Sequence, residues 1–117
     1  MGNFHKLRVW QKAKNLAVLI YKETREGKLA RDFGLRDQIR RAAVSIASNI
    51  AEGDELGSDK QAVKFFYIAK GSAAELLTQA IIASEIGYFD KEKFQCISKE
   101  CKAVSGMLTL LIAARSK

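Results

Sequence analysis

Residue types that carry acid–base, nucleophilic or metal chemistry are scarce in this sequence. His5 is its only histidine, and its two cysteines are Cys96 and Cys101. A zinc site needs four protein ligands, or three and a water molecule, and di-iron bundles use Glu-x-x-His pairs that do not occur here. No glycine-rich phosphate loop or nucleophile motif is present. Glu52 and Glu75 could form a carboxylate pair, but no other feature of the sequence supports one. We therefore expect no catalytic residue, no metal ion, no cofactor and no enzymatic activity.

The cysteines and the apolar segments predict a cytoplasmic protein without a membrane partner. Cys96 and Cys101 would point about 140° apart on a helix, which disfavours a disulfide and suits two thiols in a reducing compartment. Lys12 and Lys14 interrupt any early apolar segment of signal-peptide type. The longest uncharged stretch, residues 103–114, has 12 residues and is too short to span a bilayer.

The excess of positive charge predicts a polyanionic partner. The chain carries 20 Lys and Arg against 13 Asp and Glu, a net charge of +7. Residues 1–53 hold 11 basic and 5 acidic residues, net +6, whereas residues 54–117 hold 9 and 8, net +1. Basic surfaces of this kind bind nucleic-acid phosphates through a salt-dependent term that carries little sequence information. A basic face that is merely solvated is the alternative.

The candidate contacts to nucleic acid come from the first two predicted helices. Arg8, Lys12 and Lys22 fall within about an 80° arc opposite the apolar side of the first helix. Lys14 and Arg25 lie beside that arc. With a second cluster in the next helix, the candidate nucleic-acid-binding residues are Arg8, Lys12, Lys14, Lys22, Arg25, Arg36 and Arg40. No aromatic residues are interleaved with them, so base stacking on a single strand is not predicted.

These residues must be positioned by helices, because the chain has no proline and its apolar residues recur at helical spacing. Ser58 and Asp90 are good N-caps, and Gly87 is a C-terminal stop. With short connections, the simplest architecture is an all-α, up-down-up-down antiparallel four-helix bundle, a single domain over residues 1–117. The sequence predicts helices at about 7–24, 35–52 and 59–86 and a fourth after Asp90, with a loop at 28–34 and a turn at 53–57.

Two stripes lie outside the predicted core and favour a homo-oligomer. Phe65 and Ile68 belong to a second apolar stripe on the third helix, separate from its core stripe, and an apolar face of this kind suits a subunit interface. A polar stripe of short side chains flanks the core of the second helix. The candidate interface residues are Arg41, Ser45, Asn49, Glu52, Phe65 and Ile68. A broad core stripe and a solvated polar face are the alternatives. Gly71, inside the third helix, is expected to permit close helix packing.

Four segments resemble a known family. Residues 7–13 read LRVWQKA, 35–53 read LRDQIRRAAVSIASNIAEG, 69–76 read AKGSAAEL and 86–88 read IGY. They are similar to blocks of the four-helix-bundle proteins once labelled S23 ribosomal proteins. Those proteins are encoded in intervening sequences of bacterial 23S ribosomal RNA genes and elsewhere. The family is related to the accessory variability determinant of diversity-generating retroelements.

The resemblance implies a cytosolic bundle that assembles as a homopentameric ring, with a basic surface for nucleic acid and no enzymatic activity. In the retroelement branch the ring works with a reverse transcriptase. The hypothesis from the sequence is therefore a non-enzymatic oligomer that binds RNA or DNA backbone through its first two helices. The alternative is a scaffold or accessory subunit that binds a protein partner and makes no direct contact with nucleic acid.

Overall fold

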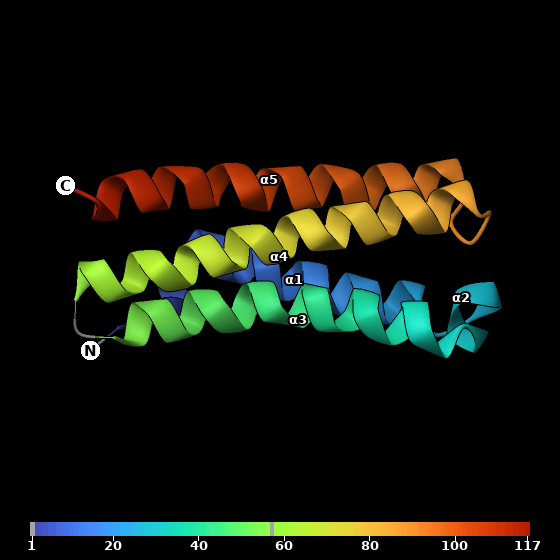
Figure 1. The fold of residues 1–117 in the computed structure, drawn as a ribbon, viewed down its shortest axis with the longest axis horizontal. Helices are drawn as coiled ribbons and strands as arrows, with labels where there is room; N and C mark the ends of the chain where they lie inside the picture. Colours follow the sequence, from blue (N-terminus) through green and yellow to red (C-terminus); the bar gives the residue numbers. More distant parts are fainter. Residues whose placement is uncertain (1, 57) are drawn as a thin grey trace.

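The computed structural model describes residues 2–56 and 58–117. Within these ranges it is all-helical, without strands. The elements are η1 (Phe4–Lys6), α1 (Arg8–Glu23), α2 (Gly27–Arg31), α3 (Phe33–Glu55), α4 (Asp59–Glu85) and α5 (Lys91–Arg115), as Figure 1 shows.

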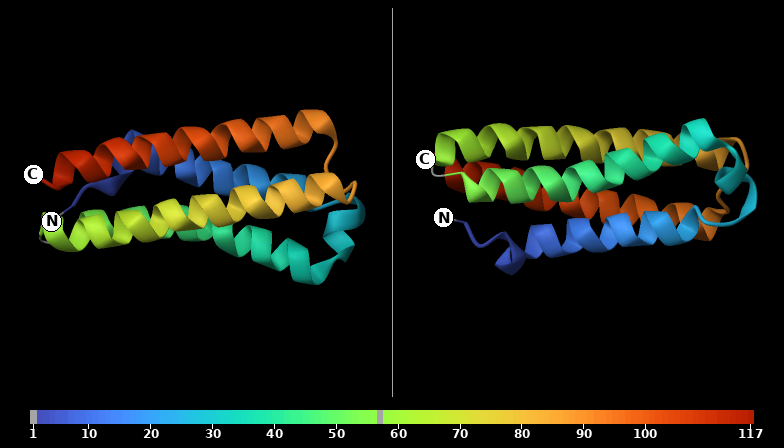
Figure 2. Two further views of the ribbon diagram at one scale, coloured as in Figure 1. Left: turned by 45° about the horizontal axis from the view of Figure 1, so that its top comes forward. Right: turned by 90° about the horizontal axis from the view of Figure 1, so that it is seen from below.

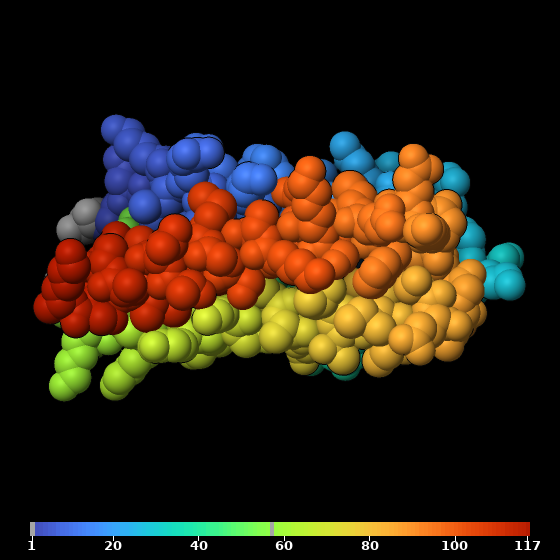
Figure 3. All heavy atoms as spheres, turned by 90° about the horizontal axis from the view of Figure 1, so that it is seen from above, coloured from blue at the N-terminus to red at the C-terminus, as the bar shows by residue number. Residues whose placement is uncertain are grey.

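The four long helices, α1, α3, α4 and α5, form an antiparallel bundle with extents of 44 × 20 × 20 Å. Helix α3 packs between α1 and α4, and α5 contacts both α4 and α1, which closes a four-cornered arrangement. The space-filling view in Figure 3 shows α5 between α1 and α4. Both chain ends lie at one end of the bundle, and α2 lies at the other (Figures 1 and 2). The prediction of an all-α four-helix bundle is confirmed.

The helix ends predicted from cap residues are also confirmed. The Ser58 side chain accepts a hydrogen bond from the backbone N–H of Gln61 at 3.3 Å, and Asp90 accepts one from Lys93 at 2.7 Å. These side chains satisfy backbone donors that have no partner in the first turn of a helix. Gly87 takes a φ of +82° just after α4, in the left-handed region that favours glycine.

The predicted loop at residues 28–34 is wrong, because this segment forms the short helix α2 and the start of α3. Leu29 is only 2% exposed, so burial of its side chain in the core stabilises a helix that is too short to persist alone. Gly27, with φ +81°, lets the chain enter α2 at a sharp angle. Asp32 then caps α3 by accepting a hydrogen bond from the N–H of Leu35 at 3.2 Å.

The predicted turn at residues 53–57 is wrong at residues 53–55, since α3 continues to Glu55, and Gly57 lies outside the described residues. Asp54 is held inside this last turn from two sides. Its carboxylate pairs with Arg115 of α5 at 3.0 Å and accepts the N–H of Asn3 at 2.9 Å. These bonds fasten the N-terminal segment and two helix ends together and keep the final turn of α3 helical.

Close helix packing occurs at Gly53 and not at Gly71, contrary to the sequence-based expectation. A β-carbon at Gly53 would lie 2.9 Å from Cε1 of Phe66 and 3.1 Å from the carbonyl oxygen of Ala62, both on α4. In the part of the chain that the structure describes, nothing lies within 4 Å of a β-carbon built on Gly71, which is exposed. The absence of a side chain at Gly53 therefore lets α3 and α4 approach at this end of the bundle.

The two cysteines differ in burial, which predicts different thiol reactivity. Cys101 is 1% exposed in the core, and burial, with the charge of Glu100 next, raises the pKa of its thiol to about 12. Because only the thiolate attacks alkylating reagents, Cys101 should react far more slowly than the exposed Cys96 near pH 8. Native-state alkylation followed by peptide mass spectrometry checks this, and equal labelling of the two thiols would contradict the core position of Cys101.

Candidate nucleic-acid interface

Three of the predicted cations line a groove between α1 and α3, the two helices that face the viewer in the right panel of Figure 2. The groove has a volume of about 390 Å³. We call it the α1–α3 groove, and its lining consists of Lys14, Ala17, Val18, Tyr21, Lys22, Arg25, Val44, Ala47 and Ser48. Lys14, Lys22 and Arg25 are all exposed, and among the described residues no carboxylate lines the groove. It therefore presents concentrated positive charge.

The floor of the α1–α3 groove is apolar. Val18, Tyr21 and Val44 are 45%, 44% and 41% exposed, which is high for side chains of this type. Ala17 and Ala47 contribute only methyl groups, and such small side chains leave a hollow where the two helices meet. The groove thus combines cationic edges with an apolar floor.

Arg40 adjoins the α1–α3 groove at Tyr21, and its guanidinium contacts uncharged groups near the end of α1. Its Nε donates to Oγ1 of Thr24 at 2.8 Å, and its guanidinium lies 4.6 Å from the centre of the Tyr21 ring. Thr24 is fully buried and also donates to the carbonyl oxygen of Ile20 at 2.8 Å. Arg40 therefore joins α3 to the C-terminal turn of α1, where a cation also complements the helix dipole.

The other three predicted cations lie away from the α1–α3 groove. Lys12 turns toward α5, where its Nζ lies 3.4 Å from Oε1 of Glu100. Arg8 lines a separate hollow with apolar residues of α1 and α5, including Leu110. Arg36 lies near α2, with its Nη1 donating to the carbonyl oxygen of Ala30 at 3.1 Å. The arc predicted from Arg8, Lys12 and Lys22 is thus divided among different surfaces.

The predicted oligomer-interface residues gather on the outer face of α3 and α4, which we call the α3–α4 face. Oγ of Ser45 lies 2.9 Å from Oγ of Ser72, a hydrogen bond that joins the two helices. Asn49 donates to the carbonyl oxygen of Ser45 at 2.8 Å. Arg41 and Glu52 are exposed beside this polar pair.

The apolar part of the α3–α4 face lies on α4. Phe65 is half-buried and Ile68 is 52% exposed. Ile82 and Ile86, at 46% and 51%, continue the exposed apolar residues toward the end of α4. Among the described residues, one buried side-chain oxygen without a hydrogen-bond partner, Oε1 of Gln79, belongs to the same helix. Sequence reasoning missed Ser72, because its role depends on the register between α3 and α4.

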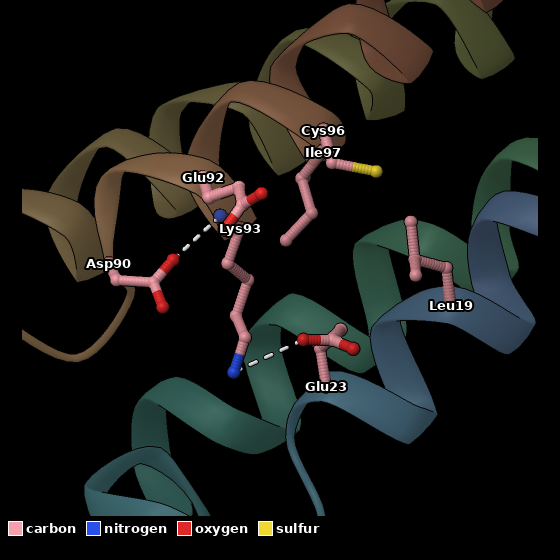
Figure 4. A pocket seen from close by; sticks show the side chains of 7 residues that line it. All are labelled: Leu19, Glu23, Asp90, Glu92, Lys93, Cys96 and Ile97. Atoms are coloured by element: carbon pink, nitrogen blue, oxygen red, sulfur yellow. Dashed lines mark hydrogen bonds and ion pairs between the residues drawn. The ribbon is translucent and has the colours of Figure 1, made fainter.

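A second cavity, of about 270 Å³ between α1 and α5, is lined by three acidic side chains, and two of them make structural contacts (Figure 4). Glu23 pairs with Nζ of Lys93 at 3.1 Å, and Asp90 caps α5 through the N–H of Lys93. Over residues 2–56 and 58–117, no cluster of three His, Cys, Asp or Glu side chains could hold a metal ion. No helix in the same ranges is long and apolar enough to cross a membrane.

The fold places the chain among the helical-bundle proteins. The chain belongs to the family of 23S rRNA-intervening sequence proteins, because the model of that family matches residues 5–110. The family resemblance seen in the sequence is thereby confirmed.

The bundle is similar to a crystal structure from Bacteroides thetaiotaomicron VPI-5482, that of a protein with unknown function from the S23 ribosomal protein family. The TM-score is 0.82 with 24% sequence identity, over 89% of this chain and 97% of that chain. This likeness supports the fold. No curated protein matches the chain.

Proposed function

We propose that this chain is a non-enzymatic, oligomeric bundle that binds the RNA or DNA backbone through the α1–α3 groove. The observation that carries the proposal is the lining of that groove by Lys14, Lys22 and Arg25 without a carboxylate. Cations on such an edge neutralise phosphates and release counterions, whatever the base sequence.

A salt titration tests this function. Fluorescence anisotropy should show that the wild-type protein binds labelled RNA and duplex DNA, with log Kobs falling linearly as log salt rises. The slope for duplex DNA is expected to be about −0.9 per phosphate contacted. Absence of binding, or binding that salt does not weaken, would contradict the proposal.

The α3–α4 face supports a further part of the proposal, assembly of several copies, and the family resemblance implies that the assembly is a pentameric ring. Burying Ile68, Ile82 and Ile86 against a neighbouring copy would remove an exposed apolar stripe from water. A face that contacts a different face of the next copy generates closed rings when the rotation allows it.

Sedimentation equilibrium is expected to give a mass of about 65 kDa, five times the 13.0 kDa chain. Ile68→Lys should shift the population to smaller species, because it places a charge in the apolar part of the interface. Leu110→Lys, at a side chain 72% exposed on α5, is the matched control and should leave the mass unchanged. A wild-type mass near 13 kDa would contradict the assembly.

The apolar floor of the α1–α3 groove favours a second candidate, an accessory subunit or scaffold that holds a protein partner, for example a reverse transcriptase. An acidic amphipathic helix would place apolar side chains on Val18, Tyr21 and Val44 and its carboxylates near the cations. Affinity capture distinguishes the two functions. A defined protein partner that stays bound after nuclease treatment, with no salt-dependent nucleic-acid binding, would favour the scaffold.

A further inference from the structure

An exposed aromatic ring lies among cations at the α2 end of the bundle. Phe33, the first residue of α3, is 64% exposed. It lines a hollow of about 480 Å³ with four other residues from α2, the α2–α3 junction and the α4–α5 connection. We call this site the α2 corner, and its lining is Lys28, Arg31, Asp32, Phe33 and Tyr88.

The two cations that line the α2 corner, Lys28 and Arg31, are available to bind a ligand. The segment 25–36 carries four basic and two acidic residues. The acidic residue at the corner, Asp32, accepts hydrogen bonds from the N–H of Leu35 at 3.2 Å and from the hydroxyl of Tyr88 at 3.0 Å. Among the ion pairs of residues 2–56 and 58–117, none involves Lys28 or Arg31.

Phe33 is held in place, and much of its surface remains open to solvent. The Arg36 guanidinium lies 4.7 Å from the centre of the Phe33 ring. Arg36 is itself fixed by bonds to the carbonyl oxygen of Ala30 at 3.1 Å and to Asp37 at 3.0 Å. Large apolar side chains are normally exposed singly and without consequence. Phe33 differs because the Arg36 guanidinium lies against its ring and because Lys28 and Arg31 line the same hollow.

We propose that the α2 corner binds an unpaired nucleotide, with the base stacked on Phe33 and the adjoining phosphates held by Lys28 and Arg31. Proteins that bind single-stranded nucleic acid combine these two features, an aromatic platform and a basic track along the backbone. Arg25, which lines the α1–α3 groove, closely precedes α2 in the chain, so one strand could follow both sites. The inference rests on the proposed function and narrows its ligand from any nucleic acid to one with unpaired bases.

The test compares two ligands at one salt concentration, a single-stranded adenine-rich RNA and a fully paired duplex. Phe33→Ala should weaken binding of the single strand by about 5- to 150-fold, the loss typical of one stacked base, and change duplex binding less than about twofold. Phe33→Trp should restore single-strand binding. Tyr67→Ala, at an aromatic ring 59% exposed on α4, is the matched control and should change neither affinity.

The outcomes separate this inference from the function on which it rests. If the wild type binds neither ligand, both proposals are wrong. If it binds both ligands and Phe33→Ala weakens neither, or weakens them equally, the α2 corner is not a stacking site and only this inference fails. Circular dichroism should show unchanged helix content in all three variants, since Phe33 and Tyr67 are exposed.

Discussion

Replacing Lys14, Lys22 and Arg25 together by glutamate is expected to weaken nucleic-acid binding by about a hundredfold or more at moderate salt, through the loss of three phosphate contacts. The substitution turns a groove edged by three cations into one edged by three carboxylates. Each lost contact should also flatten the plot of log Kobs against log salt by about one unit. Anisotropy titrations at several salt concentrations measure both effects. The bundle should stay folded, because all three side chains are exposed.

A matched variant separates the position of the charge from its amount. Lys64, Lys99 and Lys102 are exposed on α4 and α5, and replacing them by glutamate changes the net charge of the chain equally. Net charge alone influences association with any polyanion. We expect this control to lose much less affinity than the groove variant. Equal losses would show that the binding follows total charge and that the α1–α3 groove has no special role.

Gly53→Ala is expected to have the largest effect on stability, a loss of about 1–3 kcal/mol from overpacking. Its β-carbon would lie 2.9 Å from Cε1 of Phe66, 3.0 Å from Cβ of Phe65 and 3.1 Å from the carbonyl oxygen of Ala62. Phe66 is fully buried and the carbonyl belongs to the α4 backbone, so neither can move easily. The added methyl group must therefore push α3 from α4.

Gly106→Ala is the matched control for Gly53→Ala. Both glycines lie inside long helices, but among the described residues nothing lies within 4 Å of a β-carbon built on Gly106, which is on α5 and outside the proposed interface. Alanine there should stabilise the bundle by about 0.5–1 kcal/mol, because glycine has a low helix propensity. Denaturant unfolding of the two variants gives both values. The same sign of change in both would contradict the close approach at Gly53.

The long helices could be predicted because their signals are local. Apolar residues at intervals of three and four, and caps such as Ser58 and Asp90, need no knowledge of the tertiary structure. Helix α2 has five residues, too few for such a pattern, and it depends on the burial of Leu29. The continuation of α3 past Gly53 likewise depends on distant partners, Arg115 and Asn3.

The sequence predicted which types of residue form the candidate site, but it did not predict which of these residues lie together. A helical projection places Lys12 and Lys22 on one side of α1, yet it does not show which neighbouring helix each side chain meets. The packing turns Lys12 toward Glu100 on α5 and leaves Lys22 in the α1–α3 groove. An aromatic platform among the cations was not predicted. Phe33 is separated in the sequence from Tyr88, and only the fold brings both to one hollow.

Nucleic acid is proposed to occupy the α1–α3 groove, and lysine acetylation footprinting shows directly whether it does. The wild-type protein is acetylated with and without single-stranded RNA, and each lysine is quantified by peptide mass spectrometry. Bound phosphates should slow the acetylation of Lys14 and Lys22, and the exposed Lys64 and Lys102 should react at unchanged rates. Equal protection of all four lysines, or protection confined to α4 and α5, would contradict the claim.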